Sequence, residues 1–133
     1  MLHKTYKSEI INKAEQLLQE CAGWLRLLDF VKQENAYLKT RLSLAVDHKT
    51  DKEFLNQAEH FQNEFILKDE YINEIAKDAK LQEDRIKEIV LLQKNVEDKY
   101  IRQQQKLRNE IEYLEKDFTR MKYDFNKQLF SIT

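Results

Sequence analysis

Apolar residues recur at alternating steps of four and three in the first third of the chain. The stripe has one polar member, Asn35, and predicts a helix over about residues 6 to 46, because these steps place side chains on one helix face. Its members are Leu17, Cys21, Trp24, Leu28, Val31, Asn35, Leu38, Leu42 and Ala45.

The stripe stops at the polar segment VDHKTD, residues 46–51. Thr50 and Glu53 have the spacing of a capping box, in which the hydroxyl accepts from a free backbone N–H and the carboxylate reaches back. A second stripe follows at once and predicts a helix over about residues 51 to 93. Its members are Phe54, Ala58, Phe61, Phe65, Lys68, Ile72, Ile75, Ala79, Gln82, Ile86, Ile89, Gln93 and Val96.

From about Leu107 the stripe is shifted by one residue, and it then predicts a helix over about residues 97 to 130. Asn95, three residues before Asp98, is expected to begin this helix by accepting free N–H groups. A stutter inside one helix of about 80 residues would produce the same shift. The members of this third stripe are Leu107, Ile111, Leu114, Phe118, Met121, Phe125 and Leu129.

Two architectures therefore stay open. The first is an all-α, elongated, antiparallel coiled-coil bundle of three long helices forming a single domain over residues 1–133. The second is a helical hairpin with one very long second helix, which must dimerise to bury its stripe. The bundle is preferred because two turns would bring the aromatic residues together, with Val31 level with Phe65 and Phe125.

The composition supports an all-α fold. The chain has 133 residues, no proline and one glycine, Gly23, so it lacks the residues that most tight turns need. The sum of charges is −1, but residues 50–93 carry eleven acids against six basic residues, while both flanking segments are weakly basic. This distribution favours packing of the middle segment against the other two.

Asn35 occupies a core position, in the segment KQENAYLKTRL, which resembles a leucine zipper over roughly 20 residues. An amide there costs stability but disfavours alignments that leave it without a partner, so we interpret Asn35 as a register residue. Solvation at a loosely packed place is the alternative. A leucine-zipper DNA-binding protein is not indicated, because the preceding helix is not basic.

No pattern of catalytic, phosphate-binding or metal-binding residues is present. His60 and Glu64 share a helix face, but a metal site needs further ligands. Cys21 lies on the first stripe, where we expect a buried, unreactive thiol. Gly23 inside the helix suggests close approach of a bulky neighbour, or else a kink or docking notch. No enzyme activity, cofactor, metal or small-molecule substrate is expected.

We expect a cytoplasmic interaction or scaffold protein that acts through self-association or protein-partner binding, because neither a signal peptide nor a membrane span is evident. Nucleic-acid association through the basic face of the last helix is the alternative function. Several apolar residues beside the stripes, including Leu44, Leu67 and Tyr37, either widen the core or form an interface. The expected interaction and register residues are Trp24, Asn35, Leu38, Leu42, Phe61, Phe65, Phe118 and Phe125.

Overall fold

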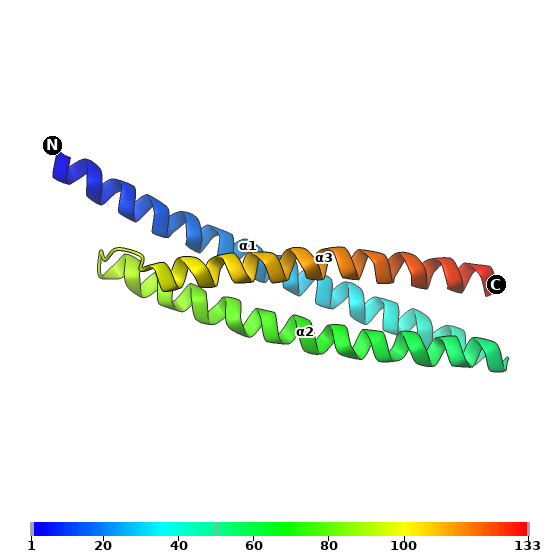
Figure 1. Ribbon diagram of the computed structural model, residues 1–133. Coiled ribbons are helices and arrows are strands. Elements are labelled where there is room, and N and C mark those ends of the chain that lie inside the picture. Colours follow the sequence, from blue (N-terminus) through cyan, green and yellow to red (C-terminus); the bar gives the residue numbers. More distant parts are fainter. Residues whose placement is uncertain (1, 50, 133) are drawn as a thin grey trace. The chain divides into compact units, whose positions relative to one another are not determined.

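The computed structural model consists of three long helices packed antiparallel, which confirms the all-α bundle and excludes the hairpin with one very long second helix (Figure 1). It describes the backbone of residues 2–49 and 51–132, and the side chains of residues 13–49 and 51–129. The helices are α1, Leu2–His48; α2, Lys52–Leu91; and α3, Asp98–Ile132. Within the described backbone there is no strand.

The chain divides into two compact units, each built from a segment of all three helices. Unit 1 comprises residues 1–28 and 74–112, and unit 2 comprises residues 29–73 and 113–133. The prediction of a single domain stays a prediction. Each unit is described separately below.

The first connection, between α1 and α2, is short. The backbone N–H of Leu55 donates to the carbonyl of Asp51 (2.9 Å), and Glu53 lies in the first turn of α2, where the helix dipole favours an acid. The predicted capping box also requires Thr50, which lies outside the described residues.

The second connection forms without glycine or proline. Gln93 adopts a left-handed conformation with a φ of 54°. Its N–H donates to the carbonyl of Val90 (3.1 Å), and the N–H of Lys94 donates to that of Ile89 (3.1 Å). These two bonds form a Schellman motif, which satisfies carbonyls at the end of a helix and reverses the chain direction. Gln93 therefore holds the position that glycine occupies most often.

The start of α3 corrects one prediction. The carbonyl of Glu97 accepts from the N–H groups of Tyr100 (3.0 Å) and Ile101 (3.4 Å), so Glu97 and not Asn95 is the N-cap residue. Asn95 lies in the connection and is exposed. Asn95 and Glu97 are both polar residues near this boundary. The hydrogen bonds of the first turn show that the helix begins after Glu97.

Side chains of the three stripes form the core of each unit. In unit 1, Ala14, Ile86 and Ile89 are buried together, and half-buried apolar side chains pack against them. In unit 2, phenylalanines pack among aliphatic side chains, and they are described below. Most members of each stripe are buried, because packing against two neighbours removes the apolar face of each helix from water. Gln93 and Val96, which were predicted to continue the second stripe, lie in the connection after α2, and Gln93 is exposed.

The alignment of the helices in unit 2 differs from the predicted one. Asn35, and not Val31, lies beside the backbone of Phe65, to which it is hydrogen-bonded. Arg41 lies over the ring of Phe125, 5.6 Å from its centroid. The prediction assumed a turn at residues 47–50, but α1 continues to His48 and α2 begins at Lys52. In addition, helical side chains lean toward their own N-terminus, which shifts contacts between antiparallel helices.

Candidate functional site

All of the predicted interaction and register residues are buried within the chain. Trp24 belongs to the core of unit 1, and the other seven belong to unit 2. Their side chains stabilise the bundle by removing apolar surface from water. Their role in binding a partner stays a prediction. The seven residues in unit 2 are Asn35, Leu38, Leu42, Phe61, Phe65, Phe118 and Phe125.

Three phenylalanines form the aromatic centre of unit 2. The ring of Phe125 in α3 lies edge-on to Phe61 and Phe65 in α2, with centroids 5.3 Å and 5.2 Å apart. Phe61 and Phe65 are stacked at 6.4 Å. These are favourable arrangements for aromatic rings. The cluster joins α2 to α3. The prediction that aromatic residues of all three helices meet was wrong for α1, because Phe30 and Tyr37 are exposed.

The side chain of Asn35 joins α1 to α2. It is fully buried, and its Nδ2 donates to the backbone carbonyl of Phe65 (2.9 Å) and to Oδ1 of Asp69 (2.8 Å). Asp69 is also paired with Lys39 of α1. The burial of Asn35 excludes the alternative of a solvated amide. Its Oδ1 is buried and has no hydrogen-bond partner, which is a cost that a leucine would not carry.

Lys68 occupies a position on the second stripe where an apolar residue is expected. It pairs with Asp117 of α3, and both side chains are largely buried. Burial by itself raises the pKa of Asp117, but hydrogen bonds from Lys68 and Arg120 and the charges of both lower it below its ordinary value. The ion pair thus occupies a stripe position without leaving an unpaired charge.

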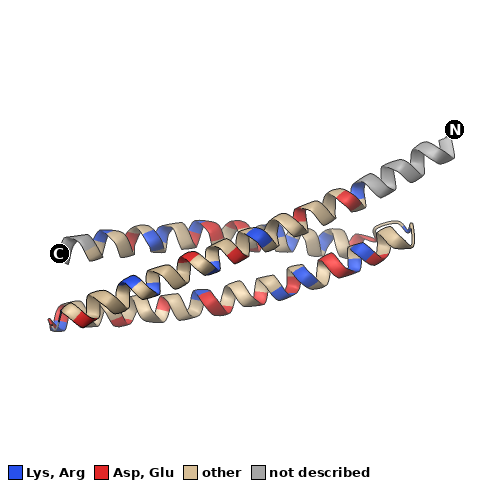
Figure 2. Cartoon of the chain, turned by 180° about the vertical axis from the view of Figure 1, so that it is seen from behind, with Lys and Arg blue, Asp and Glu red and all other residues tan. Residues whose placement is uncertain are grey.

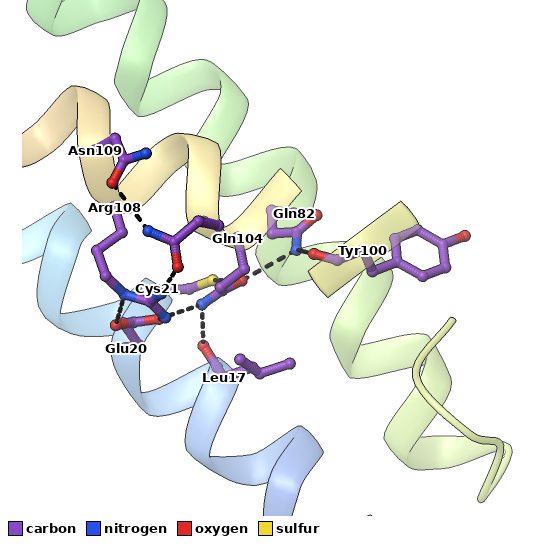
Figure 3. Close-up of polar contacts among 9 residues, drawn as sticks. Leu17, Glu20, Cys21, Gln82, Tyr100, Gln104, Arg108 and Asn109 are labelled. Carbon is purple, nitrogen blue, oxygen red and sulfur yellow. Dashed lines mark hydrogen bonds and ion pairs between the residues drawn. The ribbon is translucent and has the colours of Figure 1, made fainter. Parts of the chain in front are cut away.

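Unit 1 contains a polar layer, the glutamine layer, formed by Gln82 of α2, Gln104 of α3 and the helix α1 beside them (Figure 3). The Nε2 of Gln82 donates to Oε1 of Gln104 (3.0 Å) and to the carbonyl of Tyr100 (2.8 Å). The Nε2 of Gln104 donates to the carbonyl of Leu17 (3.2 Å) and to Glu20 (2.8 Å). A single amide therefore bridges three helices.

The glutamine layer is a polar site that the stripe pattern did not predict. Gln82 was placed on the second stripe, but Gln104 was not assigned to the third, although it precedes Leu107 by the three residues that the heptad requires. Extending that stripe backwards would have placed a second amide in the core. The hydrogen-bond partners would still not have been evident.

Glu20 and Arg108 close one side of the glutamine layer with a bidentate ion pair, in which the Nε and a terminal nitrogen of Arg108 donate to Glu20 at 2.9 Å and 2.7 Å. Burial raises the pKa of the Glu20 carboxyl, but hydrogen bonds from Arg108 and Gln104 outweigh it and hold the pKa below its ordinary value. The carboxylate is therefore charged at neutral pH.

Cys21 lies under the glutamine layer, where its Sγ donates to Oε1 of Gln104 (3.6 Å). The side chain is buried, as its place on the first stripe predicted. Burial raises the pKa of the thiol to about 11, although the hydrogen bond to Gln104 opposes this. A neutral, inaccessible thiol is a poor nucleophile.

Gly23 does not accommodate a neighbouring helix. A Cβ atom added at this position would meet one atom within 4 Å, the terminal nitrogen of Arg26 at 3.8 Å, which is an ordinary contact with a residue of the same helix. The prediction that a bulky neighbour approaches Gly23 closely was therefore wrong. Gly23 lies between Cys21 and Trp24 but is not a member of the first stripe, so its spacing places it beside the packed face of the helix and not on it.

His60 and Glu64 lie together as predicted, with Nε2 and Oε1 3.3 Å apart. Among the described residues, no group of three or more His, Cys, Asp or Glu side chains is arranged to hold a metal ion. A groove of about 310 Å³ between α1 and α2 of unit 2 has an apolar floor that includes Leu42 and Phe65. Lys39 and Asp47 are its ionisable lining residues.

Basic side chains of α3 are mostly paired with acids. Lys106 lies 3.9 Å from Glu110, and Arg108, Arg120 and Lys122 pair with Glu20, Asp117 and Glu34, respectively. Figure 2 shows basic and acidic residues interspersed along the helices. Pairing within the chain lowers the charge that these residues present to a phosphate backbone.

Most of the apolar residues predicted to lie beside the stripes are exposed, so a three-helix core does not absorb them. Leu27, which precedes Leu28 of the first stripe and was also expected to lie beside it, is half-buried. The large apolar side chains that are exposed in unit 2 are Phe30, Tyr37, Leu44, Leu55, Ile66, Leu67, Tyr113 and Tyr123.

Comparison with protein-family models, with curated proteins and with solved structures finds no match to this chain. Across the described residues, each helix is too polar for a segment of membrane-spanning length.

Proposed function

We propose that this chain is a non-enzymatic interaction protein that associates with itself or with a protein partner through the outer faces of its helices. One observation carries the proposal. After the three stripes have formed a closed core, large apolar side chains still lie on the surface, among them Tyr37 and Leu67, whose exposed fractions are 64% and 60%. Large apolar side chains that stay exposed beside a complete core are candidates for a binding surface.

The buried polar contacts support a role that depends on alignment. Asn35 in unit 2 and Gln82 and Gln104 in unit 1 each find hydrogen-bond partners on a neighbouring helix. A slip by one heptad would separate these amides from their partners and leave them buried without hydrogen bonds. A single alignment keeps the same outer side chains on the same face, as an interaction surface requires.

Chemical cross-linking followed by mass spectrometry tests the proposal, with the intact chain expressed in the cell that produces it. We expect specific cross-links to a second copy or to another protein. Replacing exposed apolar residues by serine should remove these cross-links without changing the helix content. Two results together would refute the proposal. The wild-type chain and the serine variant would give identical cross-links, and the wild-type chain would be monomeric at high concentration.

A further inference from the structure

The outer face of α1 in unit 2 carries large apolar side chains at a regular spacing. Phe30, Tyr37 and Leu44 are seven residues apart and have exposed fractions of 57%, 64% and 57%. Two helical turns, about 10.5 Å, separate each from the next, so they lie along one side of the helix. We call these three residues, together with Glu34 and Arg41 between them, the outer stripe.

The outer stripe has the pattern of a coiled-coil seam outside the core. Glu34 and Arg41 lie four residues after Phe30 and Tyr37, respectively, and both are partly exposed. The steps along the stripe are therefore 4, 3, 4 and 3 residues. Three of the five members are apolar and two are charged, and a stripe at this spacing is suited to a further helix packed along it.

Resting on the proposed function, we infer that the outer stripe binds the outer stripe of a second copy of this chain, with the two α1 helices antiparallel about a twofold axis at Tyr37. Residues equally distant from the axis then face each other. Phe30 meets Leu44 of the second copy, and Tyr37 meets Tyr37 of the second copy. The same patch serves both chains, as in most homodimers.

Charge supports this partner and this orientation. Glu34 precedes Tyr37 by three residues and Arg41 follows it by four, so the twofold axis brings each close to the opposite charge of the second copy. A parallel pairing would instead place Glu34 beside Glu34 and Arg41 beside Arg41, which is unfavourable. The outer stripe is thus complementary to itself in the antiparallel orientation.

Contacts within the chain prepare the two charged side chains for this role. Glu34 accepts from Lys122 of α3 (2.9 Å), and Arg41 donates to Asn126 (2.7 Å) while its guanidinium lies 5.9 Å from the ring centroid of Tyr37. A carboxylate accepts several hydrogen bonds and a guanidinium donates up to five, so both can also bind across the twofold axis. Holding them in place reduces the entropy lost on association.

Sedimentation equilibrium of the intact chain, at concentrations up to roughly 1 mM, tests the inference. We expect a monomer–dimer equilibrium. Tyr37→Glu places two carboxylates at the axis and should weaken the dimer at least about tenfold, since a central tyrosine is a common hot spot. Tyr123→Ser is the matched control, because Tyr123 is exposed to a similar extent (66%) but lies on α3. Circular dichroism verifies that each variant folds.

Charge reversal tests the pairing of Glu34 with Arg41. Glu34→Arg and Arg41→Glu should each weaken the homodimer at least about tenfold by opposing like charges. An equimolar mixture of the two variants should recover a dimer, because every pair across the axis is then of opposite charge. Failure of the mixture to associate more tightly than either variant alone would overturn the assigned pairing.

Disulfide cross-linking tests the orientation. Phe30→Cys and Leu44→Cys chains should form a mixed disulfide when combined under a mild oxidant, whereas Phe30→Cys alone should cross-link poorly. The wild-type chain is the control, and it should not cross-link, because its cysteine, Cys21, is buried. Efficient cross-linking of Phe30→Cys with itself would indicate a parallel pairing and overturn the inference.

The inference and the proposed function can fail separately. A dimer that Tyr37→Glu and both charge reversals leave unchanged would keep self-association but overturn its assignment to the outer stripe. A chain that is monomeric at every concentration would also overturn the assignment. The chemical cross-linking experiment with mass spectrometry would then decide whether another protein is bound.

Discussion

The Nδ2 of Asn35 and the backbone carbonyl of Phe65 form a buried hydrogen bond of 2.9 Å between α1 and α2. A side chain thus bonds to the backbone of the neighbouring helix, and not to another amide as in a symmetric coiled coil. The carbonyl belongs to a regular helix, so its position along the bundle specifies the alignment of α1 against α2.

Replacing Asn35 by leucine should raise the melting temperature, because the substitution removes the unpaired Oδ1 and buries more apolar surface. The same change should broaden the distribution of oligomers, since alternative alignments lose their penalty. Differential scanning calorimetry and light scattering measure the two effects. A lower melting temperature with one unchanged species would contradict the register role.

Asn35→Asp is the matched control, since aspartate has nearly the same shape. A carboxylate at this position would face the carbonyl of Phe65 and the carboxylate of Asp69, both of which are acceptors. We expect a loss of about 3 kcal/mol in the free energy of unfolding near neutral pH, which is typical of an unpaired buried charge. Because protonation relieves the repulsion, the loss should shrink in acid.

Gln93→Gly should stabilise the chain. Gln93 has a φ of 54°, a conformation that costs a residue with a Cβ roughly 1 kcal/mol and costs glycine little. We expect a melting temperature about 4 °C higher. Gln19→Gly, at an exposed position inside α1, is the control and should lower stability by about 1 kcal/mol. Destabilisation by both substitutions would contradict the left-handed conformation.

Gly23→Ala should also stabilise the chain, by about 1 kcal/mol, because alanine is the better helix former and its Cβ would meet one ordinary contact. Urea denaturation followed by circular dichroism measures the change. A destabilised variant would indicate a neighbour close to Gly23 or a kink in α1 at this residue.

Cys21 should be protected from thiol reagents. Its side chain is buried and its pKa is raised to about 11, so a chromogenic disulfide reagent should modify it much more slowly in the native chain than in the urea-unfolded chain. Equal rates near pH 8 would show that the thiol is accessible, contrary to the structure.

The raised pKa of Cys21 also predicts a pH dependence of stability. Between the ordinary value of 9.0 and about 11, the unfolded thiol loses its proton while the folded thiol keeps it. The unfolded state therefore binds fewer protons, and the free energy of unfolding should fall as the pH rises through this window. The free energy of unfolding should fall less over this pH range in Cys21→Ala. This variant is the control, because lysine and tyrosine side chains titrate in the same range.

Sequence periodicity was sufficient to predict the helices and their buried faces. The stripes through Leu28, Phe65 and Leu114 identified core side chains correctly, because the face of a helix on which a residue lies depends on its spacing from nearby residues. Lys68 and Gln82 were likewise correctly placed on their stripe, although periodicity could not supply their partners. Those partners, Asp117 and Gln104, come from another helix.

Tertiary structure decided the alignment between helices. Whether Phe65 lies beside Val31 or Asn35 depends on where α1 ends and α2 begins. The end of α2 was equally open, because the left-handed position there is held by Gln93 and not by a glycine. Heptads repeat every seven residues, so alignments that differ by one heptad bury similar apolar stripes. Hydrogen bonds of Asn35 and Gln104 distinguish these alignments, because a buried amide is satisfied at one alignment and unpaired at the others.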